Sequence, residues 1–262
     1  MQARSALFDL YGDYLRARGG QAPVAALVKL LAPLGIAAPA VRTAVSRMVR
    51  QGWLTPVRLP AGPGYALTPK AVRRLDEAAA RIYRTGQPAW DGQFDLIMVV
   101  DPPTTRSARS RLAANLAFLG YGMLNDRVWI SPHPSAEVAG PLAEAGVRYD
   151  RFRATLTEDG ETAASLLERA WDLKGLAGAY EQFMAELTPV VAGVAAEGDD
   201  EAAYRARFQL VHAWRTFLFR DPHLPPTLLP TDWPGHAAAR FFDQHASRLR
   251  PAADRFVDLC LS

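Results

Sequence analysis

Apolar residues recur at intervals of three and four through the first fifty residues, which is the spacing of helices with one buried face. The pattern predicts a first helix that Ser5 caps and that ends before Gly19. A second helix is expected to begin at Pro23 and to end at Gly35, because glycine readily adopts the left-handed conformation that terminates helices.

A third helix is predicted over residues 39–51, and its two faces differ in chemistry. The face expected to point into the core consists of Val41, Ala44, Val45, Met48 and Val49. The opposite face consists of Arg42, Thr43, Ser46, Arg47 and Arg50. Arginine can donate two hydrogen bonds to guanine or to phosphate, and hydroxyl groups can contact bases or backbone. These five residues are therefore candidates for DNA contact. A basic face that is merely solvated is the alternative.

Two short apolar runs, 53–59 and 65–67, flank a Pro- and Gly-rich turn and predict a hairpin, with Arg58 in its first strand. Thr68 and Pro69 are expected to cap and begin a fourth helix. Helices followed by a hairpin form the order of a winged helix-turn-helix. Residues 1–86 are therefore predicted to be a winged helix DNA-binding domain.

The central segment alternates strand and helix patterns. The predicted order is strand 94–100, a helix capped by Thr104, strand 128–130, helix 135–145 and strand 148–156. This order suggests a ferredoxin-like α/β unit, which we place at residues 91–158.

Helical spacing returns from Thr162, and residues 160–262 are predicted to be a helical C-terminal domain. Within it, the stretch 220–235 contains five prolines, which exclude a helix interior. We interpret this stretch, called the strap below, as a proline-stiffened segment that packs on the helices. The predicted fold class is thus α+β, with a winged helix, a ferredoxin-like centre and a helical C-terminal part.

The net charge of +3 is unevenly distributed. Residues 1–90 contain 13 Lys and Arg against 4 Asp and Glu, a net +9, and the remainder contains 17 against 23, a net −6. A basic segment attached to an acidic remainder suggests that the first part binds a polyanion. No stretch reaches the roughly 18 apolar residues of a membrane span, and no apolar signal core begins the chain, so we expect a cytoplasmic protein.

The sequence contains few signs of catalysis. The five histidines lack the paired i,i+4 spacing of a metal-binding helix, and Cys260 is the single cysteine, so no metal site or cofactor is expected. Asp101 follows the strand 94–100, where a hydrolase could place a metal ligand. We favour a turn residue before Pro102 and Pro103, and we assign no catalytic residue and no enzyme activity.

Several motifs together resemble the PaaX family of repressors of phenylacetic acid degradation genes, over essentially the whole chain. The strongest are RTAVSRMVRQGWL at 42–54 and LNDRVWISP at 124–132. Further matches are WDL at 171–173 with Tyr180 and Phe183, HAWR at 212–215, DPHLP at 221–225, LLP at 228–230 and WPG at 233–235.

The resemblance implies a homodimer that binds a double-stranded DNA operator and is released by an acyl-CoA effector, typically phenylacetyl-CoA. It also implies that the central domain is akin to a CRISPR adaptation nuclease. Basic residues in the wing would be expected as well, but the tip at 60–64 is uncharged here. This departure shifts the expected phosphate contacts to Arg42, Arg47, Arg50 and Arg58.

A CoA thioester needs cations for its phosphates and an apolar slot for its acyl group. The aromatic and cationic residues around the strap that could supply both are Trp214, Arg215, Arg220 and Trp233. We predict that they bind the effector, with Arg215 as the leading cation. The alternative for Arg215 is a structural tie to Asp221 or to a strap carbonyl. Two other functions remain open: a metal-dependent nuclease that uses Asp101, and a DNA-binding protein without a small effector.

Overall fold

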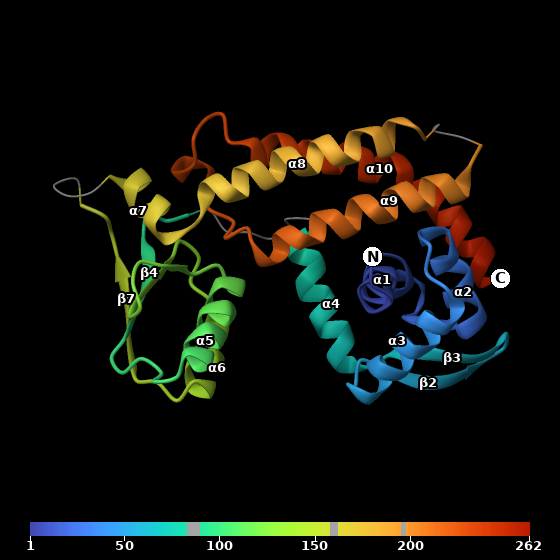
Figure 1. Cartoon of the computed structure of the whole chain (residues 1–262), viewed down its shortest axis with the longest axis horizontal. Coiled ribbons are helices and arrows are strands. Elements are labelled where there is room, and N and C mark those ends of the chain that lie inside the picture. Colours follow the sequence, from blue (N-terminus) through green and yellow to red (C-terminus); the bar gives the residue numbers. More distant parts are fainter. Residues whose placement is uncertain (83–89, 158–161, 195–197) are drawn as a thin grey trace. The chain divides into compact units, whose positions relative to one another are not determined.

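The computed structural model describes residues 1–82, 90–157, 162–194 and 198–262. Helices predominate, and two small antiparallel sheets lie in different parts of the chain (Figure 1). The described residues form two compact units. Unit 1 comprises 1–86, 183–215 and 238–262, and unit 2 comprises 87–182 and 216–237.

Unit 1 begins with short helices and a hairpin. Its first elements are α1 (Ala3–Leu10), a π-helical turn η1 (Tyr11–Leu15), η2 (Arg16–Arg18), β1 (Gln21–Pro23), α2 (Val24–Leu31), η3 (Ala32–Leu34), α3 (Ala38–Arg50), β2 (Leu54–Leu59), β3 (Gly62–Leu67) and α4 (Pro69–Ile82). The four predicted helices and the hairpin are confirmed. Two starts were wrong by a few residues: Ser5 lies inside α1, which begins after Gln2, and Pro23 precedes α2.

The sequence did not indicate β1. This strand pairs with β3, so the hairpin becomes a three-stranded sheet in the order β1-β3-β2. Gly64 of β3 faces β1 so closely that a Cβ atom there would lie 2.6 Å from both the Ala22 carbonyl oxygen and Leu59 Cδ1. Gly64, which the sequence placed in the turn, is therefore a strand residue whose lack of a side chain is a packing requirement.

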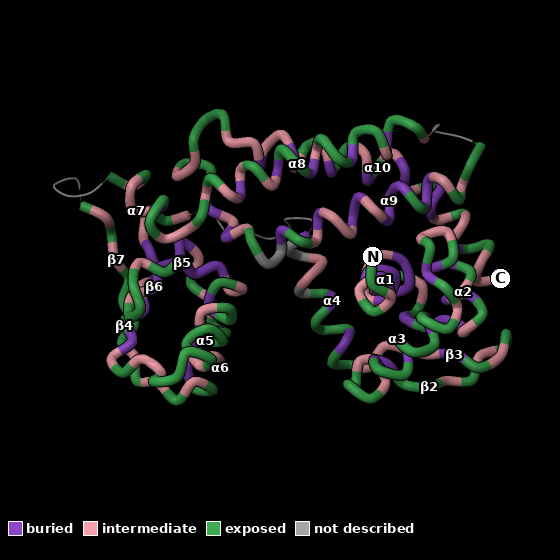
Figure 2. Tube along the Cα trace, in the orientation of Figure 1, coloured by how far each residue is buried: buried purple, intermediate pink, exposed green. Residues whose placement is uncertain are grey.

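The core of unit 1 joins the two ends of the chain. The N-terminal helices bury Leu7, Leu10, Leu27 and Met48 in one cluster. Side chains of α9 (Asp200–Trp214) and α10 (Pro234–Leu261) complete this cluster, namely Tyr204, Phe208, Ala253 and Val257. The buried stretches of α1 and α9 are coloured purple in Figure 2. The hydroxyl of Tyr204 also donates to the Leu30 carbonyl at 2.9 Å.

Unit 2 contains the second sheet. Its elements are β4 (Phe94–Val99), α5 (Arg106–Phe118), β5 (Gly122–Met123), β6 (Val128–Ser131), η4 (Ala136–Val138), α6 (Ala139–Glu144), β7 (Tyr149–Ala154), α7 (Ala163–Ala170) and the first part of α8 (Leu173–Ala192). The sheet order is β5-β6-β4-β7, all antiparallel. The sequence order βαββαβ is that of the predicted split βαβ unit. The helix cap was misplaced by one residue, because Thr105 and not Thr104 accepts from the Ala108 amide.

The strap lies in unit 2 and follows the short helical turn η5 (Arg215–Phe219). Its backbone is irregular apart from η6 (Pro226–Leu228) and its last two residues, Pro234 and Gly235, which begin α10. Its Leu224, Leu228 and Leu229 pack in a cluster with Phe94 and Ile130 of the sheet. The predicted packing on helices is confirmed for α7, whose Leu167 belongs to the same cluster, while the contact with the sheet was not predicted. The domain boundaries that the sequence predicts, at 86–91 and at 158–160, stay a prediction. The two compact units are divided differently, because residues 183–215 and 238–262 pack with the N-terminal segment.

Candidate nucleic-acid interface

Helix α3 has the two faces that the sequence predicts. Val41, Ala44, Val45 and Met48 are buried, while the five polar residues on the other side are exposed: Arg42, Thr43, Ser46, Arg47 and Arg50. The apolar face packs against α1 and α2, so the orientation of α3 follows from core packing. The polar face is thereby directed to solvent.

The exposed cations of α3 have no anionic partner among the residues that the structure describes. Within the described part of the chain, Arg42, Arg47 and Arg50 form no hydrogen bond and no ion pair with the protein. The Thr43 hydroxyl donates to the Pro39 carbonyl at 2.9 Å, so its oxygen remains an acceptor. All five donors of each guanidinium are therefore accessible to an external acceptor.

The end of α3 and the start of the hairpin are tightly fixed. Gly52 has φ 72° and its amide donates to the Val49 carbonyl at 3.0 Å, which terminates the helix. The next residue, Trp53, lies edge-on to Phe8 of α1 with ring centroids 5.3 Å apart, and the Lys70 ammonium lies 4.6 Å from its ring. These contacts fix β2 beside α3 (Figure 1).

Arg58 lies on β2, opposite Pro63 of β3, and is exposed. Like the arginines of α3, it has no protein partner among the described residues. It is the cation nearest to the uncharged tip of the hairpin in sequence. The structure thus places it on the same compact unit as the polar face of α3.

The stretch of sequence that contains α3 and the hairpin carries charge of one sign. Residues 14–75 contain ten Lys and Arg and no Asp or Glu. The two carboxylates that precede this stretch, Asp9 and Asp13, have side chains that are only 1% and 7% exposed. Asp9 pairs with His212 and Arg215 at the end of α9, and Asp13 pairs with Arg207 of α9 and Arg250 of α10. A polyanion that approaches α3 therefore meets cations without competing exposed carboxylates from this stretch.

The four predicted effector residues fall into two pairs. Trp214 and Arg215 belong to unit 1, and Arg220 and Trp233 belong to unit 2. The Trp214 indole is buried, donates to the Ile82 carbonyl at 3.1 Å and stacks on Phe242 at 4.8 Å. A structural role therefore accounts for Trp214 in this unit, and a ligand role for the four residues stays a prediction.

Arg215 pairs with Asp9, and His212 Nδ1 lies 2.5 Å from the other oxygen of the same carboxylate. The alternative expectation was a structural tie from Arg215 to Asp221 or to a strap carbonyl; the structure gives Arg215 a structural tie, but its partner is Asp9. Burial lowers the pKa of both Arg215 and His212. A neutral His212 can still donate one ring N–H to Asp9.

The strap is held by Asp221. Its carboxylate accepts from the Tyr180 hydroxyl at 2.5 Å and from the His223 amide at 2.7 Å. His223 has φ 56°, a left-handed conformation that is uncommon for a residue with a side chain. Its carbonyl lies 2.9 Å from His133 Nε2, so His133 of the sheet domain donates to the strap when neutral.

Asp101 is engaged by an arginine. Arg148 donates to its Oδ2 through Nε at 2.8 Å and Nη2 at 2.5 Å, and both side chains are exposed. The pair fits the interpretation of Asp101 as a turn residue. Among the described residues, no three His, Cys, Asp or Glu side chains gather closely enough to hold a metal ion.

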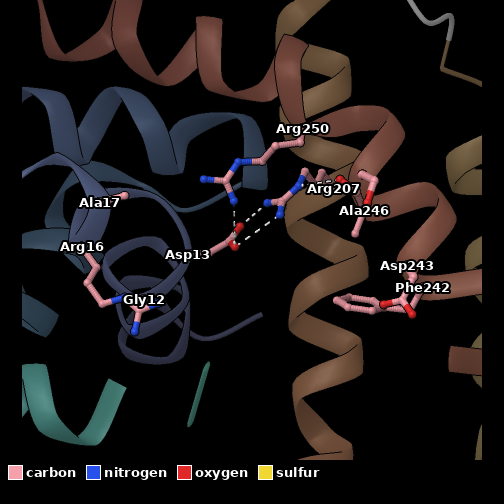
Figure 3. A pocket seen from close by; sticks show the side chains of 10 residues that line it. Gly12, Asp13, Arg16, Ala17, Arg207, Phe242, Asp243, Ala246 and Arg250 are labelled. Atoms are coloured by element: carbon pink, nitrogen blue, oxygen red, sulfur yellow. Dashed lines mark hydrogen bonds and ion pairs between the residues drawn. The ribbon is translucent and has the colours of Figure 1, made fainter. Parts of the chain in front are cut away.

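Unit 1 also contains a cavity of about 320 Å³ that the sequence did not indicate (Figure 3). We call it the arginine cavity. Its charged and aromatic lining residues are Asp13, Arg16, Arg207, Phe242, Asp243 and Arg250. They come from η1, η2, α9 and α10, so no local sequence signal could have grouped them.

Asp13 is the central anion of this cavity. Arg207, which is 2% exposed, donates to both carboxylate oxygens, and Arg250 Nη1 lies 3.4 Å from Oδ1. Figure 3 shows both guanidinium groups pointing toward Asp13. The same two groups lie 5.2 and 5.4 Å from the ring centre of Tyr14, whose pKa is raised by burial.

None of the helices described has the length and hydropathy that crossing a membrane requires. This finding agrees with the absence of a long apolar stretch in the sequence.

Comparison with known proteins accounts for nearly the whole chain. Three family models match, described as PaaX-like protein at residues 2–71, PaaX protein central Cas2-like domain at 87–166 and PaaX-like protein C-terminal domain at 171–259. The uncharacterized protein Rv0674 from Mycobacterium tuberculosis has a similar solved structure, with a TM-score of 0.60 and 26% identity over 97% of this chain and 98% of that one.

A curated relative is the transcriptional repressor PaaX of Escherichia coli strain K12. It is 33% identical over 261 residues, which span 97% of this chain and 82% of the relative. The similarity extends over all three segments, and the central segment is Cas2-like as the strand order of unit 2 also indicates. The chain belongs to the PaaX family.

Proposed function

We propose that this protein is a transcriptional repressor that binds double-stranded DNA through a winged helix-turn-helix in unit 1. The observation that carries the proposal is the exposed face of α3, where Arg42, Arg47 and Arg50 have no protein partner in the described structure. A helix of this length fits the major groove, and an arginine on it can donate two hydrogen bonds to guanine. The relative in Escherichia coli is named a transcriptional repressor.

In this proposal, α3 is the recognition helix and the hairpin β2–β3 is the wing. Thr43 and Ser46 lie between the arginines and can contact bases or phosphates, while Arg58 contacts the backbone from β2. Positive charge without exposed carboxylates between residues 14 and 75 supplies the affinity that does not depend on base sequence. The protein functions as a homodimer, because one small module seldom supplies nanomolar specific affinity.

The effector in this proposal is an acyl-CoA such as phenylacetyl-CoA, which releases the repressor from its operator in front of aromatic or acyl-CoA catabolic genes. The family membership supports this expectation. An effector releases DNA only if it binds the DNA-free state more tightly, since equal affinity for both states shifts nothing. Gel shifts titrated with phenylacetyl-CoA, free CoA and phenylacetate test this part separately.

The DNA-binding part is tested by selecting preferred sequences from a random duplex library and measuring affinity for the winning site. The variant Arg42→Ala/Arg47→Ala/Arg50→Ala should lose specific binding while remaining folded. The control removes equal charge elsewhere on the surface, with Arg106→Ala/Arg111→Ala/Arg240→Ala, all of which are exposed. Equal loss of specific binding in both triple variants, or in neither, would contradict the proposal.

A further inference from the structure

The arginine cavity is lined by residues from both ends of the chain. Arg16 belongs to η2, which follows the first helix, while Arg207 and Arg250 belong to α9 and α10. All of these residues lie in unit 1, the unit that contains α3. The cavity and the proposed recognition helix therefore belong to the same compact unit.

Two of the arginines retain unused donors. Arg16 Nη1 donates to Asp76 at 2.5 Å and to the Leu75 carbonyl at 3.4 Å, and Arg250 uses Nε for Asp254 and Nη1 for Asp13. No acceptor in the described residues engages Arg250 Nη2, or Arg16 Nε and Nη2. Their side chains are 32% and 33% exposed, so these N–H groups can reach an anion that enters the cavity.

The carboxylates around the cavity are unevenly placed. Asp13 is buried beneath Arg207 and Arg250, while Asp243 is exposed on α10. Three arginines and two aspartates line the cavity, and Asp76 and Asp254 beside it pair with Arg16 and Arg250, so an anion would be held by the unused N–H groups rather than by an excess of positive charge. Forked guanidinium donors match the oxygens of phosphate better than the point charge of an ammonium does. The lining therefore favours a phosphate-bearing molecule.

The cavity wall contains the π-helical turn Tyr11–Leu15, which carries Asp13. Turns of this kind are rare and frequently mark functional sites, because they are less favourable than the α-helix that they interrupt. Here the turn directs Asp13 toward α9 and α10, whereas Tyr11 and Leu15 enter the core. The position of the turn in the chain, directly after α1, links the cavity wall to the helix that packs on α3.

A smaller, mainly apolar cavity shares Gly12 and Asp13 with the arginine cavity. It is lined by Leu75, Ile82 and Val211, with Arg215 also in its wall. Its volume of about 30 Å³ holds little more than a water molecule, so a larger apolar group enters only if the walls separate. Such separation would act on the contact between η1 and α9.

From these observations we propose that the arginine cavity binds the phosphate groups of the effector. This inference rests on the proposed function and adds the location of the site and the way in which it acts. A bound phosphate recruits Arg250 and Arg16, and it weakens the hold of Arg250 on Asp13. Because Arg250 belongs to α10, the state in which η1 and α10 have separated then binds the effector more tightly than the DNA-bound state does, and the population shifts away from DNA.

The test measures direct binding to the full-length protein without DNA, by calorimetry with coenzyme A, phenylacetyl-CoA and phenylacetate. Arg16→Ala and Arg250→Ala should each weaken binding of both CoA compounds about tenfold or more, while Arg250→Lys, which keeps the charge but loses the fork, should be intermediate. Arg255→Ala is the matched control, because it removes an exposed arginine of the same helix that pairs with Asp200. This control should bind CoA as the unmodified protein does.

Thermal unfolding midpoints establish that each variant is folded, and the conservative Arg250→Lys remains informative if Arg250→Ala is not. The inference is overturned if the protein binds its DNA site but binds neither CoA compound, or if all four variants bind CoA equally. Failure of the proposed function has a different signature, because the protein then binds no DNA sequence specifically whatever its affinity for CoA.

Discussion

Arg207 of α9 donates to both carboxylate oxygens of Asp13 in η1, across 194 residues of sequence, with side chains that are only 2% and 7% exposed. The Arg207 guanidinium also donates to the Tyr14 hydroxyl and to the Ala246 carbonyl at 3.0 Å each. One buried side chain therefore connects the first helical segment to both α9 and α10.

Removing one partner of this pair should strongly destabilise unit 1. We expect Asp13→Asn or Arg207→Ala to lower the free energy of unfolding by about 3–5 kcal/mol, because each leaves a buried charge without its partner. Arg255→Ala breaks an exposed, solvent-screened pair with Asp200 and should change the stability far less. Urea unfolding monitored by tryptophan fluorescence measures both, and equal effects would contradict the assigned importance of the buried pair.

Acidification should lower the stability of the fold around His133, because burial opposes the protonated ring even though it could still donate to the strap. Burial lowers the pKa of His133 below its usual 6.5, so the unfolded chain takes up a proton at higher pH than the folded protein does. The contribution of neutral His133 is therefore present above pH 6.5 and is lost as the pH falls toward the folded pKa.

Denaturant midpoints at pH 7.5 and pH 5.5 check this expectation. The variant His133→Gln retains an N–H donor for the His223 carbonyl but does not titrate, so its midpoint should fall less on acidification than that of the unmodified protein. His212 and His245, whose pKa values are also lowered by burial, account for the remaining fall. An unchanged pH dependence in His133→Gln would show that the His133 contact is not the source.

Arg47→Ala should reveal what this side chain reads. If Arg47 contacts a base, affinity for the preferred site should fall by about 1–3 kcal/mol and discrimination at one base pair should relax. If it contacts phosphate, all sequences should be bound more weakly and the slope of log K against log salt should fall by about one. Filter binding at several salt concentrations distinguishes these results, and no change in either quantity would remove Arg47 from the interface.

A homodimer with two recognition helices should produce two inverted half-sites with centres about 34 Å apart, or a multiple of that distance. Hydroxyl-radical footprinting of the selected sequence measures the spacing. A protein that stays monomeric in light scattering at micromolar concentration, both free and on DNA, would rule out the dimeric arrangement.

Gly64→Ala should disturb the hairpin, because the added methyl group would lie 2.6 Å from the Ala22 carbonyl oxygen and from Leu59. We expect a loss of about 1–3 kcal/mol from overpacking. Gly140→Ala in α6 is the control, since nothing lies within 4 Å of its added Cβ atom and alanine favours helix over glycine by about 0.5–1 kcal/mol. Thermal unfolding should therefore shift in opposite directions for the two variants.

The periodic segments were predictable because their signals are local. The two faces of α3 follow from spacing alone, and the hairpin follows from two apolar runs around a Pro- and Gly-rich turn. By contrast, β1 is only three residues long, and it is a strand because it pairs with the free edge of β3. The arginine cavity was equally invisible, because Asp13 and Arg207 are brought together by packing of the chain ends.

The prediction for Arg215 shows the same limit. An aromatic and cationic cluster in the sequence suggested one ligand site around the strap, but neighbours in sequence need not share a compact unit. Arg215 belongs to unit 1, where it pairs with Asp9. Arg220, five residues later, belongs to unit 2 and donates to the Gly175 carbonyl at 3.2 Å. Spacing could not show that the boundary between the units falls directly after Arg215.

The shared core of unit 1 has a consequence for how such regulators can be recombined. Residues 1–86 cannot serve as an exchangeable DNA-binding module, because on their own they would expose the surface that Tyr204 and Phe208 cover and would leave the carboxylates of Asp9 and Asp13 without cations. A chimera that carries the proposed DNA-binding surface of this protein must inherit α9 and most of α10 as well. The first and last thirds of the chain are therefore expected to be exchanged only together.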